Sequence, residues 1–310
     1  MKFELTILGS NSALPTSKRF PTAQVLNVLE RFFLIDCGEG TQIQLKRFRV
    51  PMSRINHIFI SHLHGDHFFG LIGLISTFSL QGRTNDLHIY AHSKLEKIIR
   101  FQLEILESKL SYNLVFHNIF GKDIQTLFED DALSVQSFPL KHGAMPCAGF
   151  LFKEKERPRH LKKDMIDYYK IPIKARHGIK LGDDYLTEEG ILISNASLTQ
   201  RASAPRSYAF CTDTAYFPRI VPIIKQVDML YHEATFLKED EKRAKSTYHS
   251  TADQAAKIAD EAKVGKLLIG HFSARFHDLS AHLEEAQKMF PNTSLAKDGG
   301  VFEIPLKSNR

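Results

Sequence analysis

One short segment, FISHLHGDHFFGLIGL at residues 59–74, constrains the fold more than any other part of the chain. Within six residues it holds four side chains that can bind metals: His62, His64, Asp66 and His67. The residues before them have the apolar pattern of a short strand, and those after them are apolar and helix-like. Residues i and i+2 of a strand point to one side, and Gly65 permits a tight turn. The pattern therefore predicts a strand-to-helix turn that gathers four ligand-type side chains.

The composition of this cluster indicates a metal site. Imidazole and carboxylate suit Zn²⁺, with Mn²⁺ or iron as alternatives, and the lack of cysteine argues against a closed structural zinc site. Clustered histidines can also form a surface tract that binds nothing. The apolar flanks count against that reading, because polar groups between buried elements are unfavourable unless a metal or hydrogen bonds satisfy them. We therefore predict metal binding.

Along the chain, short strand-like runs alternate with helix-like runs, which predicts an α/β protein. Apolar residues recur at spacings of three and four at 95–110, 218–227, 252–264 and 281–290, so we expect amphipathic helices there. Several early strands follow one another without a helix, whereas later ones alternate with helices. This order favours mixed sheets over one doubly wound parallel sheet.

Charge is concentrated in one segment of the 310-residue chain. The net charge of +6 is compatible with a polyanionic partner but also ordinary for a soluble enzyme. Residues 153–180 contain ten Lys/Arg and four Asp/Glu, a local net charge of +6 that equals the excess of the whole chain. The segment lacks a clean period and carries Pro158 and Pro172, so we interpret it as a basic insertion that projects from the core. The simpler alternative is a solvated surface helix and loop.

The sequence gives no sign of membrane association or export. No apolar run approaches the ~20 residues needed to cross a bilayer, and the first residues lack a signal-peptide pattern. The three cysteines, Cys37, Cys147 and Cys211, are far apart and form no C-x-x-C pair, which is typical of a reducing compartment. We expect a cytoplasmic protein.

Four ligands are too few to complete the coordination shells of two metal ions. Three further ligand-type residues directly follow apolar strand-like runs: His142, Asp213 and His271. In α/β folds, functional groups collect at the carboxyl ends of strands. Taken singly, each could be an ordinary strand-end polar residue. Because they have the same ligand types and the same strand-end position as the first cluster, we expect them to share one site with it.

These motifs resemble a known family. The order H-x-H-x-D-H, His-Gly, Asp-Thr and a final strand-end histidine resembles the metallo-β-lactamase superfamily. Within this superfamily, the closer resemblance is to the short form of the ribonuclease Z family, which processes tRNA 3′ ends. It rests on the motifs HEATF, YHST and HFSARF, together with LGSNSALPTSKR, LIDCGEGTQIQL and FCTDTAY. The resemblance runs from Leu8 to Phe276. It implies one αββα-sandwich domain over residues 1–310, with two mixed sheets and outer helices, and an inserted tRNA-binding arm at 153–180.

The resemblance also implies residue roles. Two Zn²⁺ per subunit would be held by His62, His64 and His142 on one side and by Asp66, His67 and His271 on the other, with Asp213 bridging them. Asp66 would also accept a proton from the attacking water. His249, with Glu233 as its hydrogen-bond partner, would protonate the leaving oxygen. Asp36 either lies behind the site and orients a histidine or caps the turn after its strand.

Substrate contacts are implied in two places. Near the site these are Ser273, Arg275 and Arg19, although Arg275 could instead form a surface ion pair. In the arm they are Lys162, Lys163, Lys174 and Arg176, with Tyr168 and Tyr169 interleaved among them. The family's arm usually carries a Gly-Pro pair near its end, whereas this chain has IPIKARHG there.

Together these features predict a zinc-dependent endonuclease that removes the 3′ trailer from precursor tRNA. It would cut after the discriminator base, leave a 3′-hydroxyl on the tRNA and a 5′-phosphate on the trailer, and act as a homodimer. One alternative is another metallo-β-lactamase-fold phosphodiesterase or esterase with small substrates, which would not need a basic arm. A non-catalytic RNA-binding protein would keep the arm but would be expected to lose metal ligands.

Overall fold

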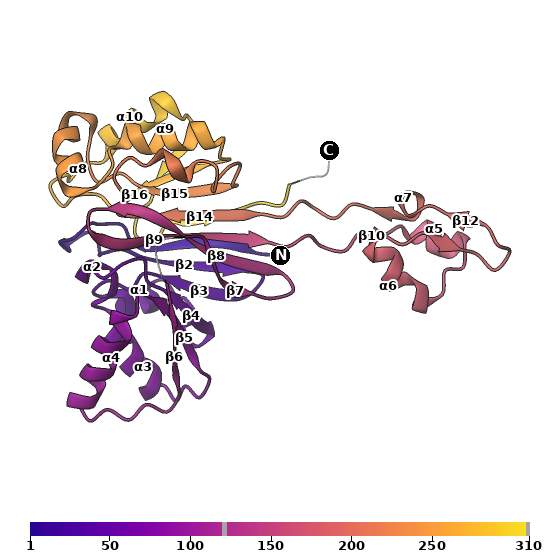
Figure 1. Cartoon of the computed structure of the whole chain (residues 1–310), viewed down its shortest axis with the longest axis horizontal. Helices are drawn as coiled ribbons and strands as arrows, with labels where there is room; N and C mark the ends of the chain where they lie inside the picture. The colour runs from indigo at the N-terminus through magenta and orange to yellow at the C-terminus, as the bar shows by residue number, and fades with distance from the viewer. Residues whose placement is uncertain (120–122, 308–310) are drawn as a thin grey trace.

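The structure, a computed structural model, describes residues 1–119 and 123–307 and contains two seven-stranded sheets packed face to face (Figure 1). The first sheet has the order β18 (Val301–Glu303), β1 (Phe3–Gly9), β2 (Ala23–Val28), β3 (Arg31–Ile35), β4 (Ile55–Phe59), β5 (Leu87–Ala91) and β6 (Leu114–Asn118). The second has the order β17 (Thr293–Leu295), β16 (Leu267–Gly270), β15 (Met229–Glu233), β14 (Ser207–Cys211), β9 (Met145–Glu154), β8 (Leu133–His142) and β7 (Gln125–Glu129).

Both sheets are mixed. Strands β1 to β3 pair antiparallel, and β3 to β6 pair parallel. In the second sheet β7, β8, β9 and β14 pair antiparallel, whereas β14 to β17 pair parallel. The parallel strands of each sheet end at a common edge, because parallel neighbours run in one direction. The predicted sandwich of two mixed sheets is confirmed.

Three apolar layers hold the sandwich together. Aromatic side chains from both inner faces, including Phe33, Phe59, Phe150 and Phe210, fill the space between the sheets. Outside the first sheet lie α1 (Thr41–Arg47), α3 (Leu71–Leu80) and α4 (Lys94–Ile105), and outside the second lie α8 (Glu241–Thr247), α9 (Ala252–Ala262) and α10 (Ser280–Met289) (Figure 1). No helix in the described part of the chain has the length and apolar character that a membrane span requires.

Three of the four predicted helices are confirmed as α4, α9 and α10, but the expected helix at 218–227 is wrong. Only a 3₁₀ turn, Pro218–Ile220, forms there. Pro222 lacks the N–H that would bond to the carbonyl of residue 218, and in a helix its ring would clash with that same carbonyl. The apolar spacing instead serves turns that pack Ile220 and Ile224 under the second sheet.

The insertion between β9 and β14 projects from one end of the sandwich (Figure 1). It is longer than the basic segment at 153–180: residues 153 and 154 still belong to β9, and the chain returns to the body only at β14. We call residues 155–206 the arm. It contains β10 (His160–Leu161), α5 (Lys163–Tyr168), α6 (Ile173–Leu181), β11 (Tyr185–Leu186), β12 (Leu192–Ile193), α7 (Asn195–Leu198) and β13 (Thr199–Gln200).

The arm has a small core and an uneven charge distribution. Ile171, Ile179 and Leu198 are buried together, and β10 pairs with β13 to close the unit. Residues 181–205 contain four Asp/Glu and one Arg, so the returning half of the arm is acidic while the outgoing half is basic. That change of sign explains why the basic segment alone did not reveal the whole insertion.

Candidate metal centre

The predicted ligand residues meet at one edge of the sandwich, where strands of both sheets end. His62 and His64 follow β4, and Asp66 and His67 lie in the short helix α2 (Gly65–Phe68). From the second sheet, His142 is the last residue of β8, Asp213 lies two residues after β14, and His271 directly follows β16. Two groups of side chains result, each with its ligand atoms within 4.8 Å of one another: His62, His64, His142 and Asp213 in the first, and Asp66, His67 and His271 in the second.

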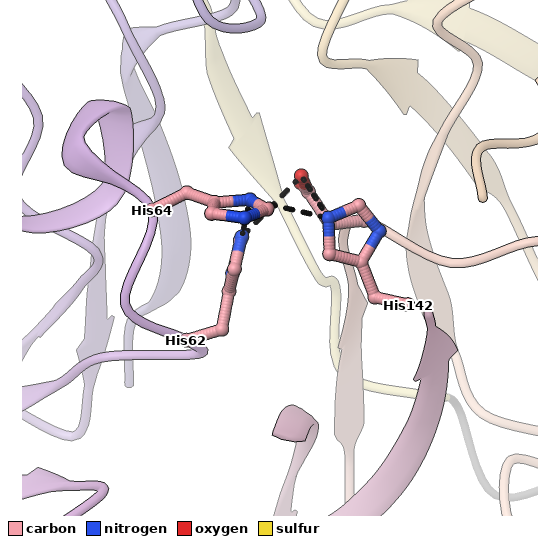
Figure 2. A group of neighbouring side chains, drawn as sticks. His62, His64 and His142 are labelled. Carbon is pink, nitrogen blue, oxygen red and sulfur yellow. Dashed lines mark hydrogen bonds and ion pairs between the residues drawn. The ribbon is translucent and has the colours of Figure 1, made fainter. Parts of the chain in front are cut away.

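In the first group, ring nitrogens converge on one small volume. His64 Nδ1 lies 3.0 Å from His62 Nε2 and 3.2 Å from His142 Nε2, and Figure 2 shows these three rings turned toward one another. Asp213 Oδ2 lies 3.5 Å from His62 Nε2 and 3.7 Å from His142 Nε2. Ligands about 2.0–2.2 Å from one tetrahedral zinc lie roughly 3.3–3.6 Å apart. The first group therefore fits a zinc-sized ion.

The second group is reached by the other oxygen of the same aspartate. Asp213 Oδ1 lies 3.2 Å from His67 Nε2 and 3.0 Å from His271 Nε2. Asp66 Oδ2 lies 3.4 Å and 3.6 Å from the same two nitrogens. The Asp213 carboxylate therefore presents one oxygen to each group.

Two buried nitrogens in the second group lie close to carboxylate oxygens but form no hydrogen bond of good geometry. These are His67 Nε2 and His271 Nε2. A buried nitrogen without a partner is unfavourable, and a cation between these nitrogens and the carboxylates would satisfy it. Both groups thus fit metal ions on their own geometry.

Behind the ligands, Asp36 orients two histidines. Its Oδ2 accepts a 2.7 Å hydrogen bond from His67 Nδ1 and a 2.9 Å bond from Ser61 Oγ, while the Ser61 N–H donates to Oδ1. Ser61 Oγ also lies 3.1 Å from His62 Nδ1. With Nδ1 of each ring engaged in this way, Nε2 presents its lone pair to the metal site. Of the two roles considered for Asp36, the structure confirms histidine orientation.

Glu233, in the second sheet, also orients two histidines. Its Oε1 lies 2.9 Å from His249 Nδ1, and its Oε2 accepts a 2.6 Å bond from Thr235 Oγ1, which lies 3.0 Å from His271 Nδ1. Burial alone would lower the pKa of His249, but the Glu233 carboxylate outweighs it and raises that pKa to about 9. Each buried carboxylate thus holds one histidine directly and a second through a hydroxyl.

Asp66 is held by the backbone of the loop after β1. The N–H of Ala13 donates a 2.8 Å hydrogen bond to Asp66 Oδ2. Asn11 stabilises this loop by donating to the Leu14 carbonyl and accepting a 2.8 Å bond from Arg19 Nε. Arg19 also donates to the carbonyl of Phe276 at 2.8 Å, so it joins this loop to the segment after His271.

Backbone conformation helps to aim three side chains of the site. Asp36, Asp213 and His271 each lie just after a strand and have φ angles of 55°, 44° and 58°. This left-handed region is uncommon for residues other than glycine, and such residues concentrate at functional sites. The sharp turn at each strand end returns the side chain toward the shared edge.

The remaining predicted contact residues lie outside the two ligand groups. Arg275 is exposed near the site, with Ser273 beside it. In the arm, Lys163 and Lys174 are exposed. Two others serve the arm itself: Lys162 Nζ donates to the Ser197 carbonyl, and the Arg176 guanidinium donates to the Ile171 carbonyl.

The sequence alone missed several supporting groups. Ser61, Thr235 and the Tyr248 carbonyl, which lies 3.1 Å from His142 Nδ1, are among them. Thr235 lies inside the HEATF motif, which was the one available signal. The thiols of Cys37 and Cys211 are buried, and neither belongs to the groups of converging ligand atoms.

The chain is similar to known proteins over nearly its full length. Residues 3–155 match a family model described as anti-Pycsar protein Apyc1, and residues 173–272 match the beta-lactamase superfamily domain. The chain is 52% identical to ribonuclease Z of Bacteroides fragilis over 297 residues, which covers 96% of this chain and 97% of that protein. It is also 52% identical to ribonuclease Z of Bacteroides thetaiotaomicron over 303 residues, 98% of this chain and 96% of that protein.

Solved structures agree with this likeness. The crystal structure of the short form of human tRNase Z superposes with a TM-score of 0.72 at 27% identity, covering 98% of this chain and 100% of that one. Identity to the bacterial proteins lies well above what fold similarity alone produces, and each match covers at least 96% of this chain. The chain belongs to the ribonuclease Z family of the metallo-β-lactamase superfamily.

Proposed function

We propose that this enzyme is a tRNA 3′-processing endonuclease that hydrolyses precursor tRNA after the discriminator base. The products are a tRNA with a 3′-hydroxyl and a trailer with a 5′-phosphate. The observation that carries the proposal is the pair of ligand groups joined by Asp213, with His249 beside them and a separate arm for the substrate. A hydrolase for small substrates would have no use for that arm.

The metal is proposed to be zinc, with two ions per subunit. His62, His64 and His142 would hold one ion, and Asp66, His67 and His271 the other, with one Asp213 oxygen toward each. Two such ions supply Lewis acidity toward a phosphate oxygen and lower the pKa of water, which supports in-line displacement at a phosphodiester. The all-His/Asp donor set supports zinc in an open, catalytic type of site.

Asp66 is the proposed general base. The Ala13 N–H donates to one of its oxygens and so fixes the orientation of the carboxylate. An ionised carboxylate in this position could take a proton from the attacking water.

His249 is the proposed general acid. Glu233 orients the ring through Nδ1 and favours its protonated form, which leaves Nε2 to deliver a proton to the departing 3′ oxygen. An alkoxide is a poor leaving group, so protonation there matters more for RNA than for an activated ester.

Replacing His249 with alanine is expected to lower kcat on precursor tRNA by about 10²- to 10⁴-fold, the range for losing a general acid. Hydrolysis of bis(p-nitrophenyl) phosphate should change only a few-fold, because nitrophenolate leaves without protonation. Steady-state kinetics on both substrates measure the difference. The His277→Ala variant, at an exposed histidine nearby, is the control. Equal losses on both substrates would show that His249 is not the acid.

Substrate contacts are proposed at the two places that the resemblance implied. Ser273 and Arg275 would contact a phosphate near the cleavage site, with Arg19 supporting their segment. In the arm, Lys163 and Lys174 offer exposed cations, while Lys162 and Arg176 add charge beside them. Phosphate contacts of this kind are largely independent of sequence, which suits recognition of A-form RNA by shape.

The enzyme is proposed to act as a homodimer in the cytoplasm. The arm leaves the sandwich before β14, whereas Asp213 lies after β14, so the arm and the metal site are at opposite ends of that strand. An arm that points away from its own site is better placed to hold a tRNA bound to a neighbouring subunit. Helix α4 offers an apolar face for that subunit: Phe101 is 63% and Ile105 66% exposed, with Ile98 on the same face.

Replacing both Phe101 and Ile105 with glutamate is expected to convert the dimer to a monomer, since two charges would be buried in the interface. Light scattering during size-exclusion chromatography reports the mass. The Leu186→Glu variant, at an exposed apolar residue of the arm, is the matched control and should stay dimeric. A glutamate variant that remains a dimer would place the interface elsewhere.

One assay tests the proposed function directly. The zinc-loaded protein is incubated with a precursor tRNA that carries a 3′ trailer, and the ends of both products are mapped. The expected result is one cut after the discriminator base, with zinc analysis giving two ions per subunit. A preparation that hydrolyses nitrophenyl diesters but leaves the RNA intact would contradict the proposal.

A further inference from the structure

The root of the arm contains a charged pair that is buried in the body of the protein. Arg206, the last arm residue, is 0% exposed, and Glu154, the last residue of β9, is 2% exposed. Arg206 Nε lies 3.0 Å from Glu154 Oε2, and Nη2 lies 2.8 Å from Oε1. The Arg206 N–H also donates to Oε2. The two residues where the arm leaves and rejoins the body are therefore locked by a bidentate bond.

This pair also contacts the two terminal segments of the chain. Arg206 Nη1 donates to the Met1 carbonyl at 3.2 Å and to the Ile304 carbonyl at 2.9 Å. The guanidinium stacks over the Phe3 ring at 5.3 Å. One side chain thus joins four segments: the end of β9, the start of β14 and the segments flanking β1 and β18.

Glu154 extends the network into the arm. Its Oε1 also accepts a 2.6 Å hydrogen bond from Arg157 Nη2, within the first residues of the outgoing segment. Beyond this point the two connecting segments, 155–159 and 201–206, have no β-structure, and the strands of the arm begin only at β10 and β13. Contacts at the root therefore contribute to the direction in which the arm leaves the body.

Stability alone does not account for such a pair. Removing two charges from water offsets most of their attraction, and apolar residues of similar volume are often equally or more stable. What an arginine–carboxylate fork does provide is a fixed mutual angle between its partners.

We propose that Arg206 and Glu154 are positioning residues that hold the arm at the angle required to bind precursor tRNA. This inference rests on the proposed function of the arm. The pair lies far from the ligand groups and touches no reacting atom. Its effect acts through the effective concentration of the arm near the RNA, which falls when the arm samples many directions.

The test replaces the pair with apolar residues of similar volume, Arg206→Met with Glu154→Leu, and measures kinetics and arm geometry. KM for precursor tRNA is expected to rise about tenfold with kcat within about twofold, because a less directed arm lowers the effective concentration. Hydrolysis of bis(p-nitrophenyl) phosphate should not change. Spin labels at Glu188→Cys in the arm and Lys225→Cys in the body should give a broader distance distribution, and the three native cysteines are buried.

Two further variants separate positioning from stability. Arg206→Lys keeps the charge but not the fork, so it should broaden the distances and raise KM even if the double variant fails to fold. Ile258→Val, in the core below the second sheet, should lower the melting temperature without altering either readout. Wild-type distances and KM in a folded variant without the fork would overturn the inference. Because the spin-label distances need no RNA, they test the anchor even if the wild-type enzyme does not cut precursor tRNA.

Discussion

Replacing Asp66 with asparagine is expected to lower kcat by about 10³-fold or more on both precursor tRNA and bis(p-nitrophenyl) phosphate, the upper range for losing a general base. Asparagine keeps an oxygen near His67 and His271 but cannot accept the proton of the attacking water. It also removes a negative charge from the second ligand group. Both substrates need the same proton transfer, so kcat should fall for both.

Zinc content must be measured alongside these rates. If activity falls much further than zinc occupancy, the missing proton acceptor rather than the missing ligand explains the loss. Asp130→Asn is the control, because Asp130 pairs with Arg31 at 2.5 Å on a surface away from the ligand groups. An Asp66→Asn enzyme with near-normal turnover on either substrate would remove Asp66 from the mechanism.

Excising the arm is expected to slow cleavage of precursor tRNA but not hydrolysis of the nitrophenyl diester. Residues 160–200 can be replaced by Gly-Ser-Gly, because His160 and Gln200 are paired neighbours in β10 and β13. We expect kcat/KM for precursor tRNA to fall about 10²-fold and its dependence on salt to weaken, since several phosphate contacts are lost. The nitrophenyl diester should be hydrolysed at the normal rate, because no ligand residue lies in the excised part.

A charge variant makes the same comparison without a deletion. Lys163→Glu with Lys174→Glu should shift the tRNA kinetics in the same direction, while exchange of the exposed acidic Asp183 and Asp184 for asparagine should not weaken binding. Equal losses on both substrates after excision would mean that the arm supports the fold rather than the RNA.

The residues of the two candidate ligand groups could be picked out from the sequence because their signals are local. His62, His64, Asp66 and His67 share one short segment, and His142, Asp213 and His271 are marked by the apolar strands before them. The supporting groups carry no such mark. Ser61 and Thr235 are common hydroxyl residues, and the Ala13 N–H and the Tyr248 carbonyl are backbone groups whose role depends on loop geometry.

The extent of the arm was harder to predict because its signal changes sign. Residues 153–180 stand out by positive charge, but the returning half is acidic and contains only short apolar runs. The buried Arg206–Glu154 pair was also out of reach: its partners lie 52 positions apart, and neither residue differs in type from the exposed charges around it. At residues 218–227 a clear signal was misleading: the apolar spacing is that of a helix, but Pro222 prevents the helix from forming.

The small core of the arm has a consequence for the order of folding. Pairing β9 with β14 requires closure of a long loop, and loop-closure entropy grows with the logarithm of loop length. If Ile171, Ile179 and Leu198 pack first, β10 and β13 bring the two connecting segments together and shorten the effective loop, a saving on the order of 1 kcal/mol. An arm that folds early therefore speeds assembly of the second sheet, and with it the delivery of Asp213 and His271 to the metal site.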